Sequence, residues 1–567
     1  MDAVFEQLGK RYVDEVTALA PVSATSLGDH RFDGELDEVT PEAKQRRAAF
    51  CRSYLEELDG IPRSELSRAN RIDAAMLQHR LRAELWHLEE LQEWAWNPTF
   101  YTGLAGSAVY SLMARDFAPV QDRLAAAASR LEQFPRLLEQ VRRILDPARV
   151  PKVHAETAVK QNPGVAGIVD NMVTPHLEAL PAADRGRLAR AAETARSAVS
   201  AHQRWLEDEL LPQAAGDFRL GAERFDRKLA FTLQSPLTRD QIRRRAEDEL
   251  RRVRDEMYEI AVAVYREEYP YTEAPARPSE HYGQAIIRAC LEMAYRETPG
   301  RDEVVEAADR SLAEATAFVR GADLVTVPPD PLDVIVMPEF RRGTSLAYCD
   351  SPGPLDVGQQ TFYAIAPPPA DWTDEQVRSF LREYNLRSLR NLTVHEAMPG
   401  HFLQLAHSNR YPSTLRAMLS SGVFVEGWAV CAEHTMVERG FLDADPLMRL
   451  IVLKWLLRAI ANAIIDQAIH VEGMTRDEAM ALMMERTFQE EREAAAKWVR
   501  AQLTSTQLST YFVGYLEHVD LRREVEEARG SGFDLKKYHD EVLSFGSPPT
   551  QYVRALMLDL PISERPR

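Results

Sequence analysis

The chain has 567 residues, of which 45% are hydrophobic and 28% charged, and its formal net charge is −18. This composition is typical of a globular protein with a large core, and the negative charge argues against a nucleic-acid partner, which favours basic proteins. Four widely spaced cysteines exclude a disulfide framework and a CxxC metal site. The acidic start of the chain does not resemble a secretory signal, so we expect a cytoplasmic protein without a membrane partner.

Most of the chain predicts helix, because Ala, Leu, Arg and Glu dominate and apolar residues recur at spacings of three and four. Clear examples are 120–145, 183–211, 239–265 and 303–320. The most apolar long stretch, 450–469, carries a polar residue at every fourth position, which indicates a polar stripe on a helix rather than a membrane span. These polar residues are Lys454, Arg458, Asn462 and Asp466.

The segment 332–369 breaks the helical pattern. Short β-branched or aromatic runs at 334–336 and 361–365 are separated by proline and glycine, which predicts a small sheet or hairpin. Two aromatic residues of this segment, Tyr348 and Tyr363, either line a substrate cleft or simply pack in the sheet. Helix is expected to resume after a capped start near residue 373.

Length alone allows about four domains of roughly 150 residues each, but no disordered linker separates the helical segments. We therefore expect one integrated, mainly α domain around a cleft, with a small β element between two helical parts. The predicted parts are a helical half at 1–330, the β element at 331–370 and a helical half at 371–567 that carries the functional site.

The strongest chemical signal is the segment 393–404, TVHEAMPGHFLQ. Its His395-Glu396 pair begins like the zinc-protease motif H-E-x-x-H, in which two imidazoles face one metal and the glutamate is the general base. Here the second histidine, His401, follows His395 by six residues instead of four. On a regular helix six residues turn through about 600°, which leaves the two imidazoles about 120° apart.

Pro399 suggests how this spacing can still serve a metal. A proline inside a helix lacks a backbone donor and clashes with the carbonyl four residues earlier, here that of His395. We expect a bulge or kink at Pro399 and Gly400, because glycine tolerates unusual dihedral angles. With Met398 and Pro399 as an insertion, the motif becomes H-E-x-G-H, and His401 can return to the face of His395.

A third ligand is expected downstream, because a catalytic zinc site uses three protein ligands and leaves a position for water. Glu426 is the natural candidate, at what reads as the start of a second helix. Glu433 lies seven residues further on nearly the same face and could orient a ligand imidazole. His434 and Cys431 are weaker candidates. The alternative interpretation is that the His-Glu pair lies on a solvated helix surface and that Glu426 only starts a helix.

These residues resemble the signature of a bacterial family filed as domain of unknown function 885. The segment 395–404 matches its H-E-x-x-P-G-H-x-x-Q, and 426–429 matches its E-G-W-A. The resemblance extends over most of the chain. Further matching positions are Pro21, Gly28, His30, Phe32, Asp33, Asn97, Pro98, Tyr101, Tyr384, Asn385, Arg458, Asp466, His470, Arg500, Gln507, Ser509, Tyr511, Gly514, Phe533, Asp534 and His539.

The family is similar to metallopeptidases of the gluzincin type, in which two histidines and a glutamate hold zinc. Dipeptidyl peptidase III resembles it in having an extra residue inside the His-Glu motif. The resemblance therefore implies a large helical metallopeptidase-like fold, with His395, His401 and Glu426 as metal ligands and Glu396 as the base. Gln404, the last residue of the signature, joins the substrate-binding candidates.

Two features depart from the family pattern. Ser505 and Thr506 stand where many members have Pro-Gly before the glutamine that matches Gln507. Many members also carry export signals, which we do not expect here. Both differences concern the substrate and the compartment rather than the metal.

Other candidate residues are expected near this centre. Tyr511 could donate a hydrogen bond to a tetrahedral oxyanion while neutral, or pack beneath the active-site helix. Arg500 suits bidentate contact with a substrate carboxylate. Arg458, Asp466 and His470 share a helix face. That face either borders the cleft, with Arg458 toward the substrate and the other two behind the metal ligands, or forms a structural salt-bridge network, which we prefer.

The leading functional hypothesis is a zinc-dependent metallopeptidase or amidohydrolase that cleaves a peptide or a small amide through a metal-activated water. Two alternative functions stay open. The first is a metal-dependent tailoring enzyme of secondary metabolism, and the second is a non-catalytic helical binding protein with a degenerate site. His₂Glu ligation suits Zn best, while Fe, Mn and Co are also compatible.

Overall fold

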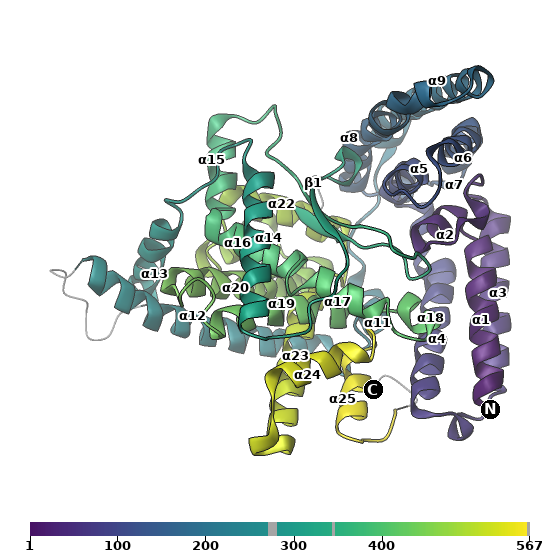
Figure 1. Cartoon of the computed structure of the whole chain (residues 1–567). Helices are drawn as coiled ribbons and strands as arrows, with labels where there is room; N and C mark the ends of the chain where they lie inside the picture. The colour runs from purple at the N-terminus through teal and green to yellow at the C-terminus, as the bar shows by residue number, and fades with distance from the viewer. Residues whose placement is uncertain (270–279, 343–345, 564–567) are drawn as a thin grey trace.

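The computed structural model describes residues 1–269, 280–342 and 346–563. The chain is mainly α-helical with one small sheet, as the sequence predicts (Figure 1). Among the described residues, no helix combines the length and the apolar character needed to cross a membrane.

Two groups of helices involve the N-terminal part of the chain, and each encloses its own apolar core. The first group contains α1 (Asp2–Ala18), α3 (Pro41–Asp59), α4 (Arg68–Trp86), α18 (Thr414–Met418) and α25 (Thr550–Met557). The second contains α2 (Pro21–Leu27), α5 (Pro98–Met113), α6 (Val120–Glu132), α7 (Phe134–Ile144), α8 (Lys152–Ile168), α9 (Ala182–Trp205) and α10 (Leu211–Gln213).

The first group joins the two ends of the chain. Leu415 of α18 and Tyr552 of α25 are buried in the same core as α1, α3 and α4. Arg416 of α18 is fully buried, and its Nε donates a hydrogen bond to Asp73 of α4 at 2.5 Å. Apolar burial and a buried ion pair thus hold the N-terminal helices against the later part of the chain.

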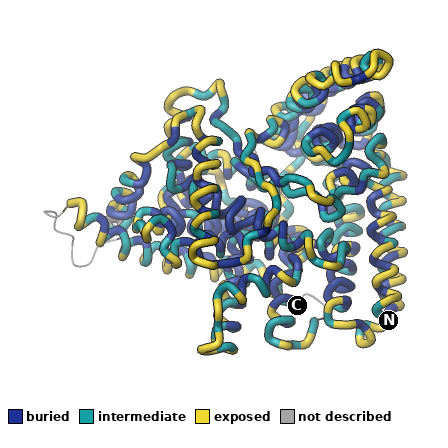
Figure 2. Tube along the Cα trace, viewed as in Figure 1, coloured by how far each residue is buried: buried dark blue, intermediate teal, exposed yellow. Residues whose placement is uncertain are grey.

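Helix α20 (Pro446–Gln467) runs through the core of the C-terminal part and is buried along most of its length (Figure 2). Around it pack α11 (Gly221–Leu233), α12 (Arg239–Glu268), α13 (Glu280–Ala294), α21 (Arg476–Ala481), α22 (Glu491–Leu503) and α23 (Ser509–Arg529). The predicted polar stripe of α20 faces partners inside the protein. Lys454 donates to Glu383 at 2.8 Å, and Arg458 pairs with Glu493 at 2.5 Å.

A third core contains residues of the sheet and of the helices near it. Its helices are α14 (Val304–Gly321), α15 (Asp374–Glu383), α16 (Leu386–Glu396), α17 (His401–Ser408), α19 (Gly422–Glu438) and α24 (Leu535–Ser544). The predicted helix start near residue 373 is confirmed, because Thr373 and Gln376 form a reciprocal capping box at the start of α15.

The sheet has three strands in the order β1-β3-β2: β1 (Leu332–Val336), β2 (Ala347–Asp350) and β3 (Thr361–Ile365). The predicted small sheet is confirmed and the two predicted runs form β1 and β3, but they pair in parallel, with Leu332 opposite Thr361, and so do not form a hairpin with each other. Strand β2 pairs antiparallel to β3 and is an edge strand beside α16. A parallel pair needs a long connection, and β2 lies within that connection.

One predicted helix is interrupted in the structure. The periodic segment 120–145 divides at Gln133 into α6 and α7. Pro135 explains the division, because proline lacks an amide hydrogen and fits the first turn of a new helix rather than the middle of a long one. The segments 239–265 and 303–320 match α12 and α14 closely.

Candidate metal centre

The two histidines lie at the facing ends of two separate helices. Asn385 caps the start of α16, which ends at Glu396, and α17 begins at His401. Between them the amide of Gly400 donates to the carbonyl of Val394 at 2.9 Å. A Cβ atom at residue 400 would lie 1.9 Å from the carbonyl oxygen of His395, so the position requires glycine. The sequence predicts a bulge or kink, whereas the structure has a complete break between two helices.

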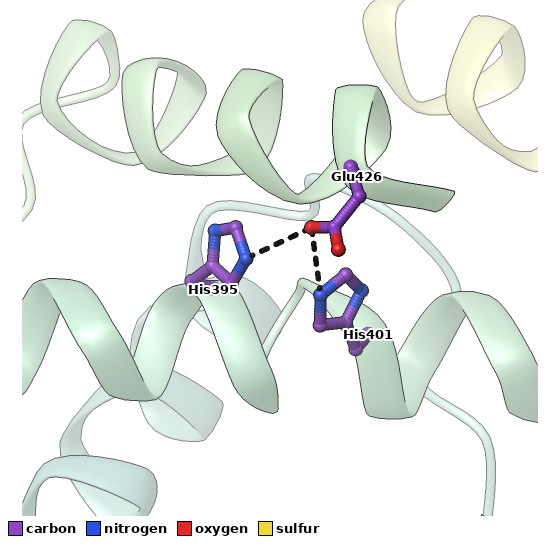
Figure 3. A group of neighbouring side chains, drawn as sticks. All are labelled: His395, His401 and Glu426. Atoms are coloured by element: carbon purple, nitrogen blue, oxygen red, sulfur yellow. Dashed lines mark ion pairs between the residues drawn. The ribbon is translucent and has the colours of Figure 1, made fainter. Parts of the chain in front are cut away.

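This break brings three ligand atoms together (Figure 3). Oε2 of Glu426 lies 3.4 Å from Nε2 of His395 and 3.4 Å from Nε2 of His401. One donor atom from each of the three residues falls within 4.8 Å of the others. Glu426 reaches the histidines from α19, as the sequence predicts for a carboxylate on a second helix.

These distances fit a tetrahedral zinc ion. Zinc binds imidazole nitrogen and carboxylate oxygen at about 2.0–2.2 Å, and tetrahedral angles then place two ligand atoms about 3.3 Å apart. The observed 3.4 Å separations between Glu426 and the two histidines agree with this value. Buried Oε2 of Glu426 also lacks a hydrogen-bond partner among the described residues. The donor set and its spacing therefore fit a divalent metal.

The pKa values of the two carboxylates Glu426 and Glu396 shift in opposite directions. Burial alone would raise the pKa of Glu426, but the neighbouring imidazoles of His395 and His401 hold that pKa well below its ordinary value. Burial raises the pKa of the Glu396 carboxyl, although the two imidazoles oppose the shift. A carboxyl held in this environment binds a proton more readily than one in water, which suits a proton-transferring group.

Glu433 stands behind His395 in the predicted position. Its Oε1 lies 2.7 Å from Nδ1 of His395, and its Oε2 accepts a hydrogen bond from the amide of Asn391 at 2.5 Å. The contact fixes the ring so that Nε2 points toward Glu426. A carboxylate in this place also raises the basicity of a ligand imidazole.

Two glycines set the distance between the helices that carry Glu426 and Tyr511. A Cβ atom on Gly427 of α19 would lie 2.4 Å from the backbone of Gly514, and one on Gly514 of α23 would lie 2.2 Å from the carbonyl of Val423. Beside this crossing, the indole of Trp428 donates to the carbonyl of Pro399 at 2.9 Å. The E-G-W segment thus ties α19 both to α23 and to the break between the histidines.

Replacing Gly427 with alanine is expected to destabilise the protein by about 3 kcal/mol or more, because a backbone contact cannot give way as a flexible side chain can. Gly422→Ala is the matched control, since it lies on the same helix with open space around its Cβ position. Its stability should change by less than about 1 kcal/mol. Thermal unfolding followed by circular dichroism measures both, and equal melting temperatures would contradict the close crossing.

A cavity of about 280 Å³ borders the metal centre. Among its lining residues are His395, Glu396, Arg458, Arg500 and Tyr511. The ring of Tyr511 lies 6.3 Å from that of His395, centroid to centroid, and its hydroxyl accepts a hydrogen bond from Arg500 at 3.0 Å. The structure therefore places these sequence-predicted residues around one cavity.

Three predicted substrate-binding residues lie elsewhere. Tyr363 is fully buried in the core around the sheet, where its hydroxyl lies 3.4 Å from that of Thr393. Tyr348 is not among the residues lining the described cavity, which includes its neighbour Ala347, because successive side chains of a strand point to opposite faces. Gln404 is fully buried and donates to Ser547 at 2.6 Å. None of the three lines the described cavity, and for Tyr363 the structure favours the packing alternative.

Asp466 and His470 were expected behind the metal ligands, but their hydrogen bonds go to the segment that joins α22 and α23. Asp466 accepts hydrogen bonds from the backbone of Thr506 and Ser509, at the turn before α23. Nε2 of His470 lies 2.9 Å from the carbonyl of Ala501, near the end of α22. These residues fix the connection between α22 and α23, and their influence on the centre is confined to placing the segment that leads to Tyr511.

Sequence reasoning missed Glu493 and Lys497, which also line the cavity. Glu493 bridges Arg458 and Lys497 and accepts a hydrogen bond from the hydroxyl of Tyr384 at 2.8 Å. Burial alone would raise the pKa of Glu493, but these cations lower it to about 2. The available signal was the i,i+4 Glu-Lys spacing on α22, which is equally typical of a solvated helix face.

Comparison with known proteins defines the family. The model of a family described as bacterial protein of unknown function, DUF885, matches residues 21–557. The chain therefore belongs to this family, as its motifs predict. No curated protein matches.

Solved structures share the whole fold. A protein from Shewanella oneidensis, described as a candidate lipoprotein of unknown function, is 33% identical, with a TM-score of 0.80 and coverage of 98% of this chain and 99% of that one. A candidate lipoprotein from Colwellia psychrerythraea is 20% identical, with a TM-score of 0.78 and the same coverage. The second likeness concerns the fold alone.

Proposed function

We propose that the protein is a metal-dependent hydrolase, with zinc as the preferred ion, that cleaves a peptide or amide bond. The observation that carries this proposal is the convergence of His395, His401 and Glu426 at tetrahedral spacing, with Glu396 on the wall of the adjoining cavity. A zinc ion held by these ligands lowers the pKa of a water molecule and polarises a substrate carbonyl.

The chain's own residues would divide the remaining work. Glu396 lines the cavity that borders the metal centre, so its carboxylate could accept a proton from the attacking water and pass it to the leaving amine. Tyr511 is the candidate oxyanion donor. Because its hydroxyl accepts from Arg500 at 3.0 Å, its own hydrogen is free to be directed toward the carbonyl oxygen that gains charge.

The compartment of this activity stays a prediction. The acidic composition was compatible with the cytoplasm, whereas the Shewanella and Colwellia relatives are described as candidate lipoproteins. A lipid-anchored form would place the same cavity before peptides of the cell envelope.

The zinc-loaded protein is expected to hydrolyse members of a mixed peptide library, with new termini identified by mass spectrometry. Treatment with a chelator should abolish cleavage, because the proposed reaction needs the metal to activate water and polarise the carbonyl. Added zinc should restore cleavage. If no peptide is cleaved under conditions where one equivalent of zinc is bound, the peptidase assignment fails and small amides or a tailoring reaction take its place.

A further inference from the structure

The wall of the cavity beside the metal centre is strongly basic. Arg458 from α20 and Lys497 and Arg500 from α22 all line the cavity that contains His395 and Glu396. We call these three cations the basic wall. Lys497 is only 4% exposed. Burying three positive charges together is costly unless negative charges compensate them.

The protein supplies one carboxylate to this wall. Oε1 of Glu493 lies 2.5 Å from Arg458 and 3.6 Å from the ammonium of Lys497. Arg500 donates to Gln507 and Tyr511, which are both neutral. The other cavity carboxylates interact with different cations, since Glu383 binds Lys454, Glu433 binds His395, and Glu396 interacts electrostatically with the imidazoles of His401 and His395. Arg458 and Arg500 alone outnumber the single carboxylate of Glu493, so the basic wall keeps an excess of positive charge whether or not Lys497 carries its proton.

Some hydrogen-bond donors of the basic wall have no partner among the described residues. Nη1 of Arg458 is buried and has no hydrogen-bond partner among the described residues. Both hydrogen bonds that Arg500 donates within the described chain use Nη2, which leaves one edge of the guanidinium for another partner. Burial and the two neighbouring arginines also push the pKa of Lys497 well below its ordinary value, an effect that a bound anion would reverse.

From this arrangement we propose that the basic wall binds the free C-terminal carboxylate of a peptide substrate, so that the enzyme removes C-terminal residues. This inference rests on the proposed hydrolase function. Arg500 contacts Tyr511, whose ring lies 6.3 Å from that of His395, so Arg500 lies close to the metal ligands, where the carbonyl of a bound substrate would react. In a C-terminal residue the carboxylate is separated from the scissile carbonyl by only one residue, about 3.8 Å along the chain.

Direct binding tests this assignment without relying on hydrolysis. The zinc-loaded Glu396→Gln protein is titrated with one N-terminally labelled peptide in three forms: free acid, C-terminal amide, and an amide with glutamate as last residue. Fluorescence anisotropy reports the dissociation constants. The free acid is expected to bind about 10- to 100-fold more tightly than the plain amide, as charge-assisted hydrogen bonds predict.

Two further substitutions in that background locate the effect. Arg500→Gln and Lys497→Met should each bring the free acid close to the affinity of the amide and leave amide binding unchanged. Arg449→Gln, an exposed position on α20 paired with Glu256, is the control and should preserve the difference. Unfolding curves of both variants verify the fold, and Lys497→Met should be tolerated because it removes a cation from a crowded positive wall.

Equal affinity for the free acid and the plain amide would overturn the C-terminal assignment. It would not bear on the hydrolase proposal, which the peptide-library assay tests separately. Equal affinity for free acid and glutamate amide would assign the wall to a side-chain carboxylate and overturn the C-terminal assignment. Failure of the hydrolase proposal has a different signature: the free acid binds selectively to the wall, but the protein with Glu396 intact cleaves no peptide.

Discussion

Glu396→Gln is expected to lower kcat for peptide hydrolysis by about 10²- to 10⁴-fold, the usual contribution of a general base. Glutamine has nearly the shape of glutamate but cannot accept a proton at its amide. The ligands His395, His401 and Glu426 remain in place, so the variant should still bind one equivalent of zinc. Turnover of a peptide selected from the library, together with metal content by mass spectrometry, measures both properties.

The specificity of this effect is checked with Glu438→Gln. Glu438 ends α19 and pairs with Arg522 at the surface, so its loss should leave turnover unchanged. A Glu396→Gln protein with the turnover of the unmodified enzyme would remove Glu396 from the mechanism. Loss of zinc in that variant would instead indicate that Glu396 supports the metal rather than the proton transfer.

His401→Ala is expected to reduce bound zinc from one equivalent to a small fraction of one. Two ligands then remain, and the buried carboxylate of Glu426 loses one of its two imidazole neighbours. Zinc should also cease to stabilise the fold. In the unmodified protein, zinc at 100 times its dissociation constant should add about 2.7 kcal/mol to the free energy of unfolding.

The matched control is His407→Ala on the same helix. Nε2 of His407 lies 2.9 Å from the carbonyl of Thr326, away from the metal ligands. It should retain one equivalent of zinc and the zinc-dependent rise in melting temperature. If the two histidine variants bind the same amount of zinc as the unmodified protein, the metal lies at another position.

The fold class followed from helical periodicity and from the β-branched runs, but finer features did not. Strand β2 has only four residues, Ala347–Asp350, and too short a run to show the alternation of a strand. Its place at the sheet edge depends on pairing with β3, a contact that no local pattern specifies. Pro135 lay inside an apolar periodic segment, so the division between α6 and α7 was also missed.

The metal ligands could be proposed because the His395-Glu396 pair, His401 and Glu426 resemble a family signature and are side chains that bind metals. How the six-residue spacing closes could not be predicted, since it depends on Gly400 packing against the His395 carbonyl and on Trp428 holding Pro399. The contact between Trp428 and Pro399 joins residues 29 positions apart. Local patterns give little information about such packing.

The cavity wall was predicted only in part for a similar reason. Tyr363 looked like a cleft aromatic, but β3 is the central strand and is buried along its whole length. Conversely, the spacing of Glu493 and Lys497 is typical of a solvated helix face, yet Glu493 pairs with Arg458 of α20 and Lys497 is buried beside it. Burial of charged side chains depends on which helices meet, which the sequence pattern alone leaves undetermined.

The central claim is that His395, His401 and Glu426 bind one divalent metal. Anomalous diffraction at the zinc absorption edge, from crystals of the zinc-loaded protein, tests it most directly. We predict one strong peak between the three side chains, about 2.0–2.2 Å from Nε2 of each histidine and from a carboxylate oxygen of Glu426. A fully zinc-loaded protein with no peak there, and with Glu426 still paired directly to both imidazoles, would contradict the account.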